Sequence, residues 1–335
     1  MKRVTLFIIA ALSLLQLGAQ QTDRIFVKPD GNGDGSSWAS PLGDLHQALA
    51  MAAPNSGTEI WVATGVYLTT SGTDRSLSFR IPSGVKLYGG FAGHEQSIEA
   101  RNIEHNPTKL SGEIGTPAVD DNAYTVVYTK NASESTLIDG FIITGGSANK
   151  KLSNDLVTPE VSGAGWYNIA TRGTSNPTIR KCKFIDNNAR EGAGFFNLAD
   201  GGEASPSIEK CQFIRNIARL DGGAVYNGSF GGKSTPRINK CRFEYNVATY
   251  GAGILNKATS GKVMTLVKSC QFISNQAHFR GAGIYNDFYG EGTSKSIMVG
   301  CIFDKNSSST GDPVSSRSNS YEGGNGVDNI SRKGY

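Results

Sequence analysis

Residues 181–189 read KCKFIDNNA, and this motif returns as KCQFIRNIA at 210–218, KCRFEYNVA at 240–248, SCQFISNQA at 269–277 and GCIFDKNSS at 300–308. A second motif alternates with it: GAGWYN at 163–168, GAGFFN at 192–197, GGAVYN at 222–227, GAGILN at 251–256 and GAGIYN at 281–286. In every copy, the last Asn of the second motif precedes the next Cys by 14 or 15 residues. Two interleaved motifs in constant phase indicate a structural repeat of about 30 residues.

The repeats have the composition of short strands rather than of helices. They are rich in Gly, Asn, Ser, Thr and β-branched residues, and Cys-x-Phe has the two-residue period that places both side chains on one face of a strand. Helical repeats would need apolar residues at helical spacing. The pattern predicts an all-β fold, a right-handed parallel β-helix, in which each repeat forms one coil. We expect this domain to cover residues 20–306, with regular coils from about residue 137.

Stacking of the coils would align like residues in columns with a spacing of about 4.8 Å. Stacked Phe rings bury a large apolar area, and Asn tolerates the left-handed backbone angles of a repeated bend. The thiols would lie side by side, which favours reduced, buried cysteines over disulfides; a metal site is the alternative, but no paired CxxC or His spacing accompanies them. The predicted columns are Cys182, Cys211, Cys241, Cys270 and Cys301; Phe184, Phe213, Phe243, Phe272 and Phe303; and Asn187, Asn216, Asn246, Asn275 and Asn306.

The two ends of the chain have a different character. Residues 1–19 predict a signal peptide, because Lys2 and Arg3 precede an apolar run and small residues follow it; a buried N-terminal helix is the alternative. Between Pro41 and Pro54, apolar residues at helical spacing predict a short helix that caps the open end of the coils. Residues 307–335 are rich in Ser, Gly and Asn and are expected to form a flexible tail.

The two motifs, behind a signal peptide, resemble the repeats of the polymorphic outer membrane proteins. More broadly, they resemble the secreted parallel β-helix proteins of the pectin-lyase-like superfamily. GGAVYN matches the family's phrase G-G-A-[ILVY] directly, whereas GAGFFN, GAGILN and GAGIYN invert its Gly-Ala order. The segment IFVKPDGNGDGSSWASPLGDLHQAL at 25–49 is similar to the start of bacterial surface β-helix proteins. The resemblance covers roughly residues 24–306 and implies the pectin lyase fold at the cell surface or outer membrane, in a superfamily that contains lyases, hydrolases and adhesins.

The sequence singles out no catalytic residues. The acidic residues of the repeats look scattered, with no dense cluster in any one coil: Asp186, Glu191, Glu203, Glu209, Asp221, Glu244, Asp287 and Asp304. Asp120 and Asp121 are adjacent, in what reads as a solvated turn rather than a catalytic dyad. The sequence predicts no cofactor; a calcium loop at Asp30, Asn32 and Asp34 is an alternative to a polar turn, but Pro41 stands where the bidentate Glu should be.

Two sets of side chains could bind a ligand on the outside of the coils. Basic residues beside the Cys strand would form a stripe for acidic glycans, or else a solvated face that prevents pairing with other sheets. Tyrosines of the second motif would point outward as an exposed aromatic stripe for sugar rings. The candidate residues are Lys181, Lys183, Lys210, Lys240, Arg242, Tyr167, Tyr226 and Tyr285.

These observations predict a secreted or cell-surface repeat protein with a non-catalytic, adhesin-like role. The expected partner is a polysaccharide or a cell-surface glycan. The alternative is a lyase or glycoside hydrolase that acts on an acidic polysaccharide. A formal net charge of +4 is too small a bias for a nucleic-acid binder, and no segment of the mature chain is apolar enough to be a transmembrane helix.

Overall fold

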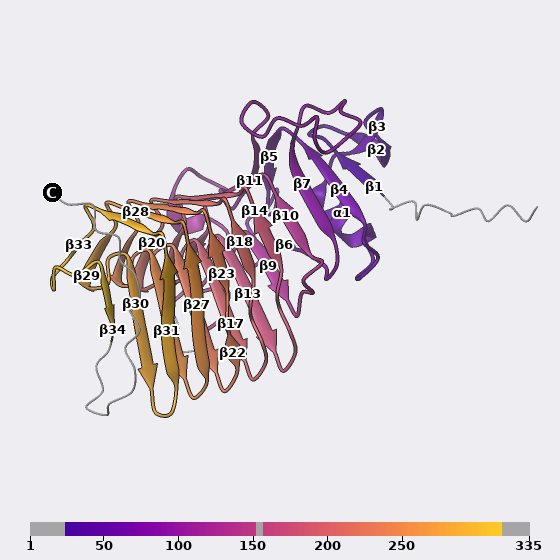
Figure 1. The fold of residues 1–335 in the computed structure, drawn as a ribbon. Helices are drawn as coiled ribbons and strands as arrows, with labels where there is room; N and C mark the ends of the chain where they lie inside the picture. Colours follow the sequence, from indigo (N-terminus) through magenta and orange to yellow (C-terminus); the bar gives the residue numbers. More distant parts are fainter. Residues whose placement is uncertain (1–23, 152–156, 317–335) are drawn as a thin grey trace, which may run out of the picture.

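The computed structural model describes residues 24–151 and 157–316, and the chain winds into a parallel β-helix of about 8 turns. Figure 1 shows the strands side by side along the solenoid, from the indigo N-terminal coils to the yellow C-terminal coils. Strands make up 50% of the described residues and helix only 3%. The predicted all-β parallel β-helix is confirmed. The predicted signal peptide at 1–19 lies outside the described residues.

Each regular coil passes in turn through four sheets, here numbered 1 to 4. Sheet 1 contains β2 (Asn32–Ser37), β3 (Ser40–Leu42), β1 (Arg24–Val27), β4 (Glu59–Ala63), β7 (Lys86–Phe91), β10 (Leu137–Asp139), β14 (Thr178–Arg180), β18 (Ser207–Glu209), β23 (Arg237–Asn239), β22 (Lys233–Ser234), β27 (Lys262–Lys268) and β31 (Thr293–Val299). Sheet 2 contains β5 (Gly65–Leu68), β8 (Thr108–Ser111), β11 (Phe141–Thr144), β15 (Lys183–Ile185), β19 (Gln212–Ile214), β24 (Arg242–Glu244), β28 (Gln271–Ile273) and β32 (Ile302–Asp304).

The other two sheets complete the coil. Sheet 3 contains β12 (Ser147–Ala148), β16 (Asn188–Glu191), β20 (Ile217–Asp221), β25 (Val247–Tyr250), β29 (Gln276–Arg280) and β33 (Ser307–Ser308). Sheet 4 contains β6 (Phe79–Arg80), β9 (Val127–Lys130), β13 (Trp166–Thr171), β17 (Phe195–Asp200), β21 (Val225–Phe230), β26 (Ile254–Thr259), β30 (Ile284–Tyr289) and β34 (Val314–Ser316). Phe184 and Phe195 contact each other edge to face at 6.3 Å, so sheets 2 and 4 enclose the core from two sides.

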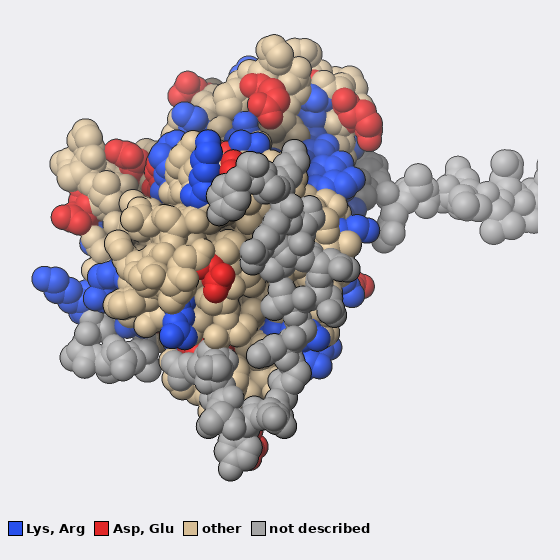
Figure 2. All heavy atoms as spheres, turned by 60° about the vertical axis from the view of Figure 1, so that its left-hand side comes forward, with Lys and Arg blue, Asp and Glu red and all other residues tan. Residues whose placement is uncertain are grey.

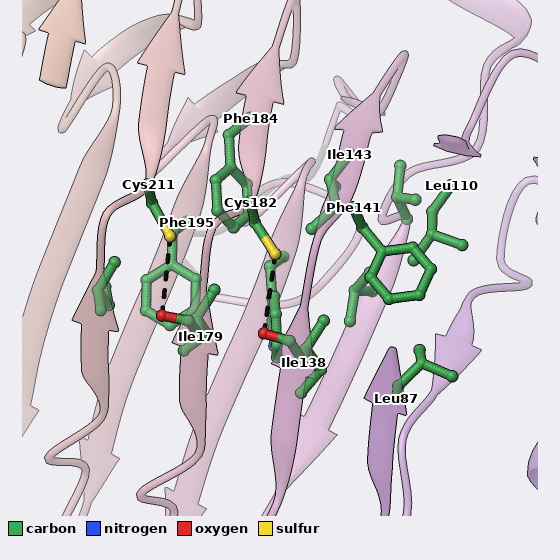
Figure 3. Packing of buried hydrophobic residues seen from close by; sticks show 14 of the residues in the cluster. Leu87, Leu110, Ile138, Phe141, Ile143, Ile179, Cys182, Phe184, Phe195 and Cys211 are labelled. Carbon is green, nitrogen blue, oxygen red and sulfur yellow. Dashed lines mark hydrogen bonds between the residues drawn. The ribbon is translucent and has the colours of Figure 1, made fainter. Parts of the chain in front are cut away.

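The interior of the coils is built from columns of identical side chains. The rings of the Phe column, from Phe184 to Phe303, stack with centroids 4.6–5.0 Å apart and planes within 6° of parallel. The five cysteines are buried free thiols. Figure 3 shows two of them directed at carbonyl groups of the preceding coil, where Cys182 Sγ donates to Ile138 at 3.8 Å and Cys211 Sγ to Ile179 at 3.7 Å.

The Asn column stacks through its side-chain amides, but it does not supply the left-handed bend. Asn187 Nδ2 donates to Asn216 Oδ1 at 3.0 Å, and the same bond repeats along the column at 2.9–3.0 Å. The positive φ angles, 52° to 55°, belong to the residue before each Asn: Asp186, Arg215, Tyr245, Ser274 and Lys305. The side chain at the bend points outward and is free to vary, whereas the next one points inward and must satisfy buried backbone groups.

The turn between sheets 3 and 4 depends on glycine. Gly192, Gly222, Gly251 and Gly281 have φ angles of 59° to 69°, and a Cβ on Gly192 would lie 2.9 Å from the Phe196 side chain. After this turn, the Asn that ends each copy of the second motif forms a second buried column in the core, a role that the sequence analysis did not assign to it. Its amides are linked at 2.7–3.5 Å: Asn168, Asn197, Asn227, Asn256 and Asn286.

The predicted capping helix is α1 (Leu45–Met51), which follows an antiparallel hairpin of β2 and β3. Asp44 caps the helix by accepting a hydrogen bond from the His46 backbone at 2.8 Å. The other described helix is the short 3₁₀ turn Val119–Asp121. At the far end, β33 and β34 pair with β29 and β30, so the coils extend past the predicted boundary at residue 306 into part of the expected tail.

Candidate functional site

The predicted basic residues form an exposed column along one corner of the solenoid. Lys181, Lys210 and Lys240 occupy the left-handed corner between sheets 1 and 2, with φ angles of 51° to 54°. Lys183 and Arg242 lie on the outer face of sheet 2, where they pair with Glu104 at 3.2 Å and with Glu244. Figure 2 shows Lys and Arg interspersed with Asp and Glu on the face that includes the C-terminal coils.

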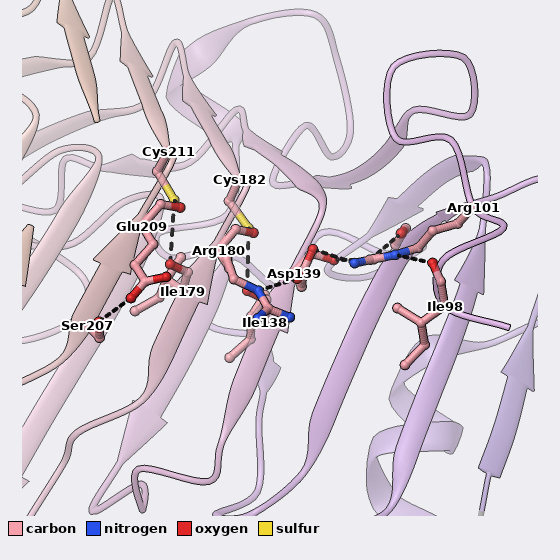
Figure 4. A network of polar contacts seen from close by, with 11 residues as sticks. Ile98, Arg101, Ile138, Asp139, Ile179, Arg180, Cys182, Ser207, Glu209 and Cys211 are labelled. Carbon is pink, nitrogen blue, oxygen red and sulfur yellow. Dashed lines mark hydrogen bonds and ion pairs between the residues drawn. The ribbon is translucent and has the colours of Figure 1, made fainter. Parts of the chain in front are cut away.

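A hollow of about 660 Å³ beside this column contains a structural ion-pair network. The Asp139 side chain is fully buried, 2.7 Å from Arg101 and 2.6 Å from Arg180 (Figure 4). Arg101 also donates to the backbone of Ile98 and Gly89. These bonds hold the loop around Arg101 against sheet 1. The buried charges therefore have a structural role.

The predicted exposed stripe of tyrosines is wrong. Tyr167, Tyr226 and Tyr285 do lie on the outer face of sheet 4, but they are only 2%, 2% and 4% exposed. The column stacks on itself, with Phe196 centred 5.1 Å from Tyr167 and 4.5 Å from Tyr226. Because neighbouring rings cover one another's faces, these tyrosines offer no open platform to a sugar. They also lie on a different sheet from the basic column, so the two predicted halves of a binding surface do not meet.

The other residues singled out in the N-terminal part serve local turns. Asp30 has a positive φ of 61°, Asn32 begins β2, and the Asp34 carboxylate accepts from the Ser36 backbone and hydroxyl at 3.0 and 2.6 Å. These bonds from Ser36 lower the pKa of Asp34 to about 2. Asp121 similarly accepts from the backbone and hydroxyl of Thr116. In residues 24–151 and 157–316, no group of three or more His, Cys, Asp or Glu side chains is arranged to hold a metal ion.

A groove of about 860 Å³ lies on the outer face of sheet 4, beside the ends of the sheet 3 strands. We call it the charged groove. It is lined by Val157, Arg190, Glu191, Leu220, Asp221, Tyr226, Phe230, Tyr250, Lys257, Phe279, Arg280, Tyr285, Asp287, Tyr289, Ser309 and Thr310. Such a mixture of aromatic and convergent charged side chains in a concave surface is typical of a ligand site.

Strand register explains why these residues meet. At the end of sheet 3, Glu191 aligns with Asp221, Asp221 with Tyr250, and Tyr250 with Arg280. On sheet 4, a second column aligns Leu198, Gly228, Lys257 and Asp287. The glycine turn folds sheet 4 back beside sheet 3, and Lys257 from the second column reaches Asp221 in the first, with Nζ 2.8 Å from Oδ2.

The carboxylates of the groove are largely removed from water. Glu191 and Asp221 are each 8% exposed and Asp287 is 5% exposed. Glu191 Oε2 lies 3.6 Å from Arg190 Nη2 and accepts from the Ser162 hydroxyl at 3.3 Å. Burial raises the pKa of Glu191, and the nearby Asp221 carboxylate raises it further. Burial alone would lower the pKa of Lys257, but the Asp221 carboxylate outweighs it and raises that pKa.

Aromatic side chains form the walls of the charged groove. Tyr250 stacks on Phe279 at 5.5 Å and on Tyr285 at 5.4 Å. Phe279 and Tyr289 are 54% and 40% exposed, so their rings reach the opening. Tyr226 reaches the floor of the groove because Gly228, two residues further along the strand and on the same face, leaves room for its ring. A Cβ on Gly228 would lie 2.6 Å from the Tyr226 ring.

Sequence reasoning named Tyr226 and Tyr285, which line this groove, but it missed the charged residues, because no single coil carries an acidic cluster. Glu191, Asp221 and Asp287 belong to three different coils, and the parallel register brings them into one groove. The signal that could have revealed them is a departure from the repeat. Where earlier coils carry Ile169 and Leu198, later coils carry lysine and aspartate at the equivalent positions.

Replacement of Glu191 with glutamine is expected to increase the free energy of unfolding at neutral pH by about 1 kcal/mol. Because the pKa of Glu191 is raised in the folded state, its carboxyl ionises first in the unfolded chain as pH rises, and ionisation then favours unfolding. The gain over the native protein should be small near pH 4 and should grow as pH rises through the raised pKa. Urea unfolding at several pH values measures it.

A matched control for this prediction is Glu209→Gln, on the outer face of sheet 1. Its effect on the free energy of unfolding is expected to stay within about 0.5 kcal/mol, as for other surface substitutions. A Glu191→Gln effect that is constant from about pH 4 to pH 7 would contradict the assignment of a raised pKa to this carboxyl.

Another hollow, of about 980 Å³, lies between α1 and β6. His46 lines this hollow, and its ring and Nε2 are both engaged in local contacts. Nε2 lies 2.8 Å from the Thr69 carbonyl, and the ring stacks on Phe79 at 4.6 Å. The charged groove is therefore the better candidate site.

None of the described helices has the length and apolar character to cross a membrane. The chain matches no family model, no curated protein and no solved structure among those compared.

Proposed function

We propose that this protein is exported from the cytoplasm and binds a chain of sugars in the charged groove. The observation that carries the proposal is the meeting of exposed aromatic rings with buried charges in one groove that spans neighbouring coils. Aromatic faces pack against the C–H faces of sugars, and carboxylates and ammonium groups bind their hydroxyls. The repetitive coil supports an extended ligand, because neighbouring coils present the groove in steps of about 4.8 Å.

The charges of the groove favour a neutral glycan. Six charged side chains line it: Glu191, Asp221 and Asp287 against Arg190, Lys257 and Arg280, and Arg190 and Lys257 pair with Glu191 and Asp221. These charges balance, so the groove offers no net positive charge to a uronic acid. The basic column on the corner between sheets 1 and 2 stays a separate proposal for acidic glycans.

This proposal is compatible with both roles predicted from the sequence. An adhesin and a glycan-cleaving enzyme both need a groove that holds the polymer. The predicted signal peptide supports a location outside the cytoplasm, at the cell surface or the outer membrane. The alternating motifs support a relation to the polymorphic outer membrane proteins and the pectin-lyase-like superfamily, which we propose on the sequence resemblance alone.

Replacement of Phe279 with alanine is expected to weaken glycan binding by about tenfold or more, because it removes an exposed ring from the groove wall. Binding is measured by calorimetry on the best ligand from a glycan array of neutral and acidic polymers. Phe279 is largely exposed, so the variant should remain folded.

Tyr245→Ala is the matched control for this prediction. Tyr245 is 55% exposed and lies on the corner between sheets 2 and 3, outside the groove. It should leave the affinity unchanged. Full affinity in Phe279→Ala, or no ligand on the array, would refute the proposed function.

A further inference from the structure

We infer that the buried cysteine column binds soft monovalent metal cations, such as Cu⁺ or Ag⁺, between neighbouring coils. Each cation lies between the Sγ atoms of two successive cysteines and bonds to both. The inference does not depend on the charged groove, because the column lies in the core, inside the corner between sheets 1 and 2. The free thiols of the column are those of Cys182, Cys211, Cys241, Cys270 and Cys301.

The thiols have the same orientation from coil to coil. Cys182 Sγ donates to the Arg180 carbonyl at 3.3 Å, and Cys211 Sγ donates to the Glu209 carbonyl at the same distance. The three later cysteines repeat this contact at 3.3–3.8 Å. Figure 3 shows the Sγ atoms of Cys182 and Cys211 pointing the same way. Because like side chains have like orientations, neighbouring Sγ atoms are separated by one step of the coil.

The length of that step fits a cation with two ligands in line. The Phe column, which lies two residues along the chain from the cysteines, measures the step, and its ring centroids are 4.6–5.0 Å apart. Sulfur atoms at this separation are about 1 Å further apart than van der Waals contact. Metal–thiolate bonds are about 2.3 Å long, so two of them in line span about 4.6 Å. A cation therefore fits the gap with little movement of the coils.

The donor atoms select the class of cation. Thiolates are soft ligands and prefer soft cations such as Cu⁺ over Mg²⁺ or Ca²⁺, which take oxygen ligands. A structural zinc ion needs four ligands in a tetrahedron, whereas each gap of the column offers two sulfur atoms. Within the two described segments, no three His, Cys, Asp or Glu side chains are grouped to hold a metal ion. The column therefore suits cations that are content with two ligands.

The exchange of protons for cations keeps the column neutral. Burial raises the pKa of the Cys211 thiol, so a bare thiolate in the core is costly. Each cation that binds displaces one thiol proton, which leaves to the solvent, and no electron is transferred. Five thiols enclose four gaps, so four cations displace four protons and one thiol keeps its own. The filled column then carries no net charge, and each inner sulfur bridges two cations.

The test counts silver bound to the full chain, because Ag⁺ needs no reductant to keep it monovalent. The chain is refolded from urea with Ag⁺ in the absence of oxygen, and loosely held silver is removed with free methionine. We expect four silver ions per chain, one for each gap. Cys241→Ala should reduce the count to two, because it removes the gaps on both of its sides. Cys182→Ala, at the end of the column, should leave three.

The two variants each lose one thiol, so they separate shared sites from independent ones. Equal silver counts in the two variants, or no silver retained by the native chain, would overturn the inference. Urea unfolding establishes that each variant folds. X-ray absorption of the silver-loaded native chain needs no variant. It should find two sulfur neighbours for each silver ion, and three or four sulfur neighbours would reject the column as the site.

Discussion

Replacement of Asn246 with alanine is expected to lower the free energy of unfolding by about 3–5 kcal/mol. Its Oδ1 accepts from the backbone and the side chain of Asn216, both at 3.0 Å. Its Nδ2 donates to the Phe213 carbonyl and to Asn275 Oδ1, both at 2.9 Å. Alanine would leave these buried groups without the amide, and each unsatisfied polar group costs about 1–3 kcal/mol.

The matched control is Asn188→Ala, the same substitution at a position on β16 where the side chain faces outward. Its expected effect is within about 0.5 kcal/mol. Both variants are measured by urea unfolding, and hydrogen exchange should show the greatest loss of protection in the coils of Asn216 and Asn275. Equal effects of the two substitutions would show that the amide column does not stabilise the fold.

The fold could be predicted because every coil of a β-helix has the same packing requirements, so its sequence repeats with the period of one coil. One coil cannot bury its own apolar face, so each coil must offer the next a matching surface. The spacing from Cys182 to Cys301 therefore revealed the period. The register of β11 with β15 aligns Ile143 with Phe184, so the regular coils do begin before the first Cys, as expected from about residue 137.

The local reason for the bend was less visible. Asn is the residue of the motif that best tolerates left-handed angles, yet the preceding residue adopts them in each coil, for example Asp186 or Tyr245. An Asn in a repeat can either adopt the left-handed backbone angles of a bend or use its side-chain amide to hydrogen-bond buried backbone groups. The sequence alone does not distinguish these two roles. The buried Asn168 column likewise serves to hydrogen-bond buried polar groups, since its amides pair across coils and also bond Ser175 and Ser234.

The candidate site was not predictable from residue types taken one coil at a time. Its charges lie on two columns whose proximity depends on the turn at Gly222 and on side chains that reach across it, such as Lys257. The outward tyrosines were correctly assigned to the outer face of sheet 4, but their burial depends on the same turn. Alignment of the repeats gives the columns; only the fold shows which columns face each other.

Replacement of Phe243 with alanine is expected to lower the free energy of unfolding by about 3–5 kcal/mol. The ring is fully buried between Phe213, at 5.0 Å, and Phe272, at 4.6 Å, so its removal leaves a cavity and ends two ring contacts. Leucine at this position refills most of the volume and should cost less, about 1–2 kcal/mol. Urea unfolding of the two variants measures the difference.

Phe279→Ala supplies the control, because it removes the same ring from a position that is 54% exposed and should change stability by only about 0.5 kcal/mol. In a solenoid each coil contacts only its neighbours, so the damage at Phe243 should be local. Hydrogen exchange should speed up in β19, β24 and β28, which carry the three stacked rings, before it does so in β1 or β4. Uniform loss of protection along the chain would instead mean that the coils unfold as one unit. The Phe column would then stabilise the whole β-helix rather than adjacent coils only.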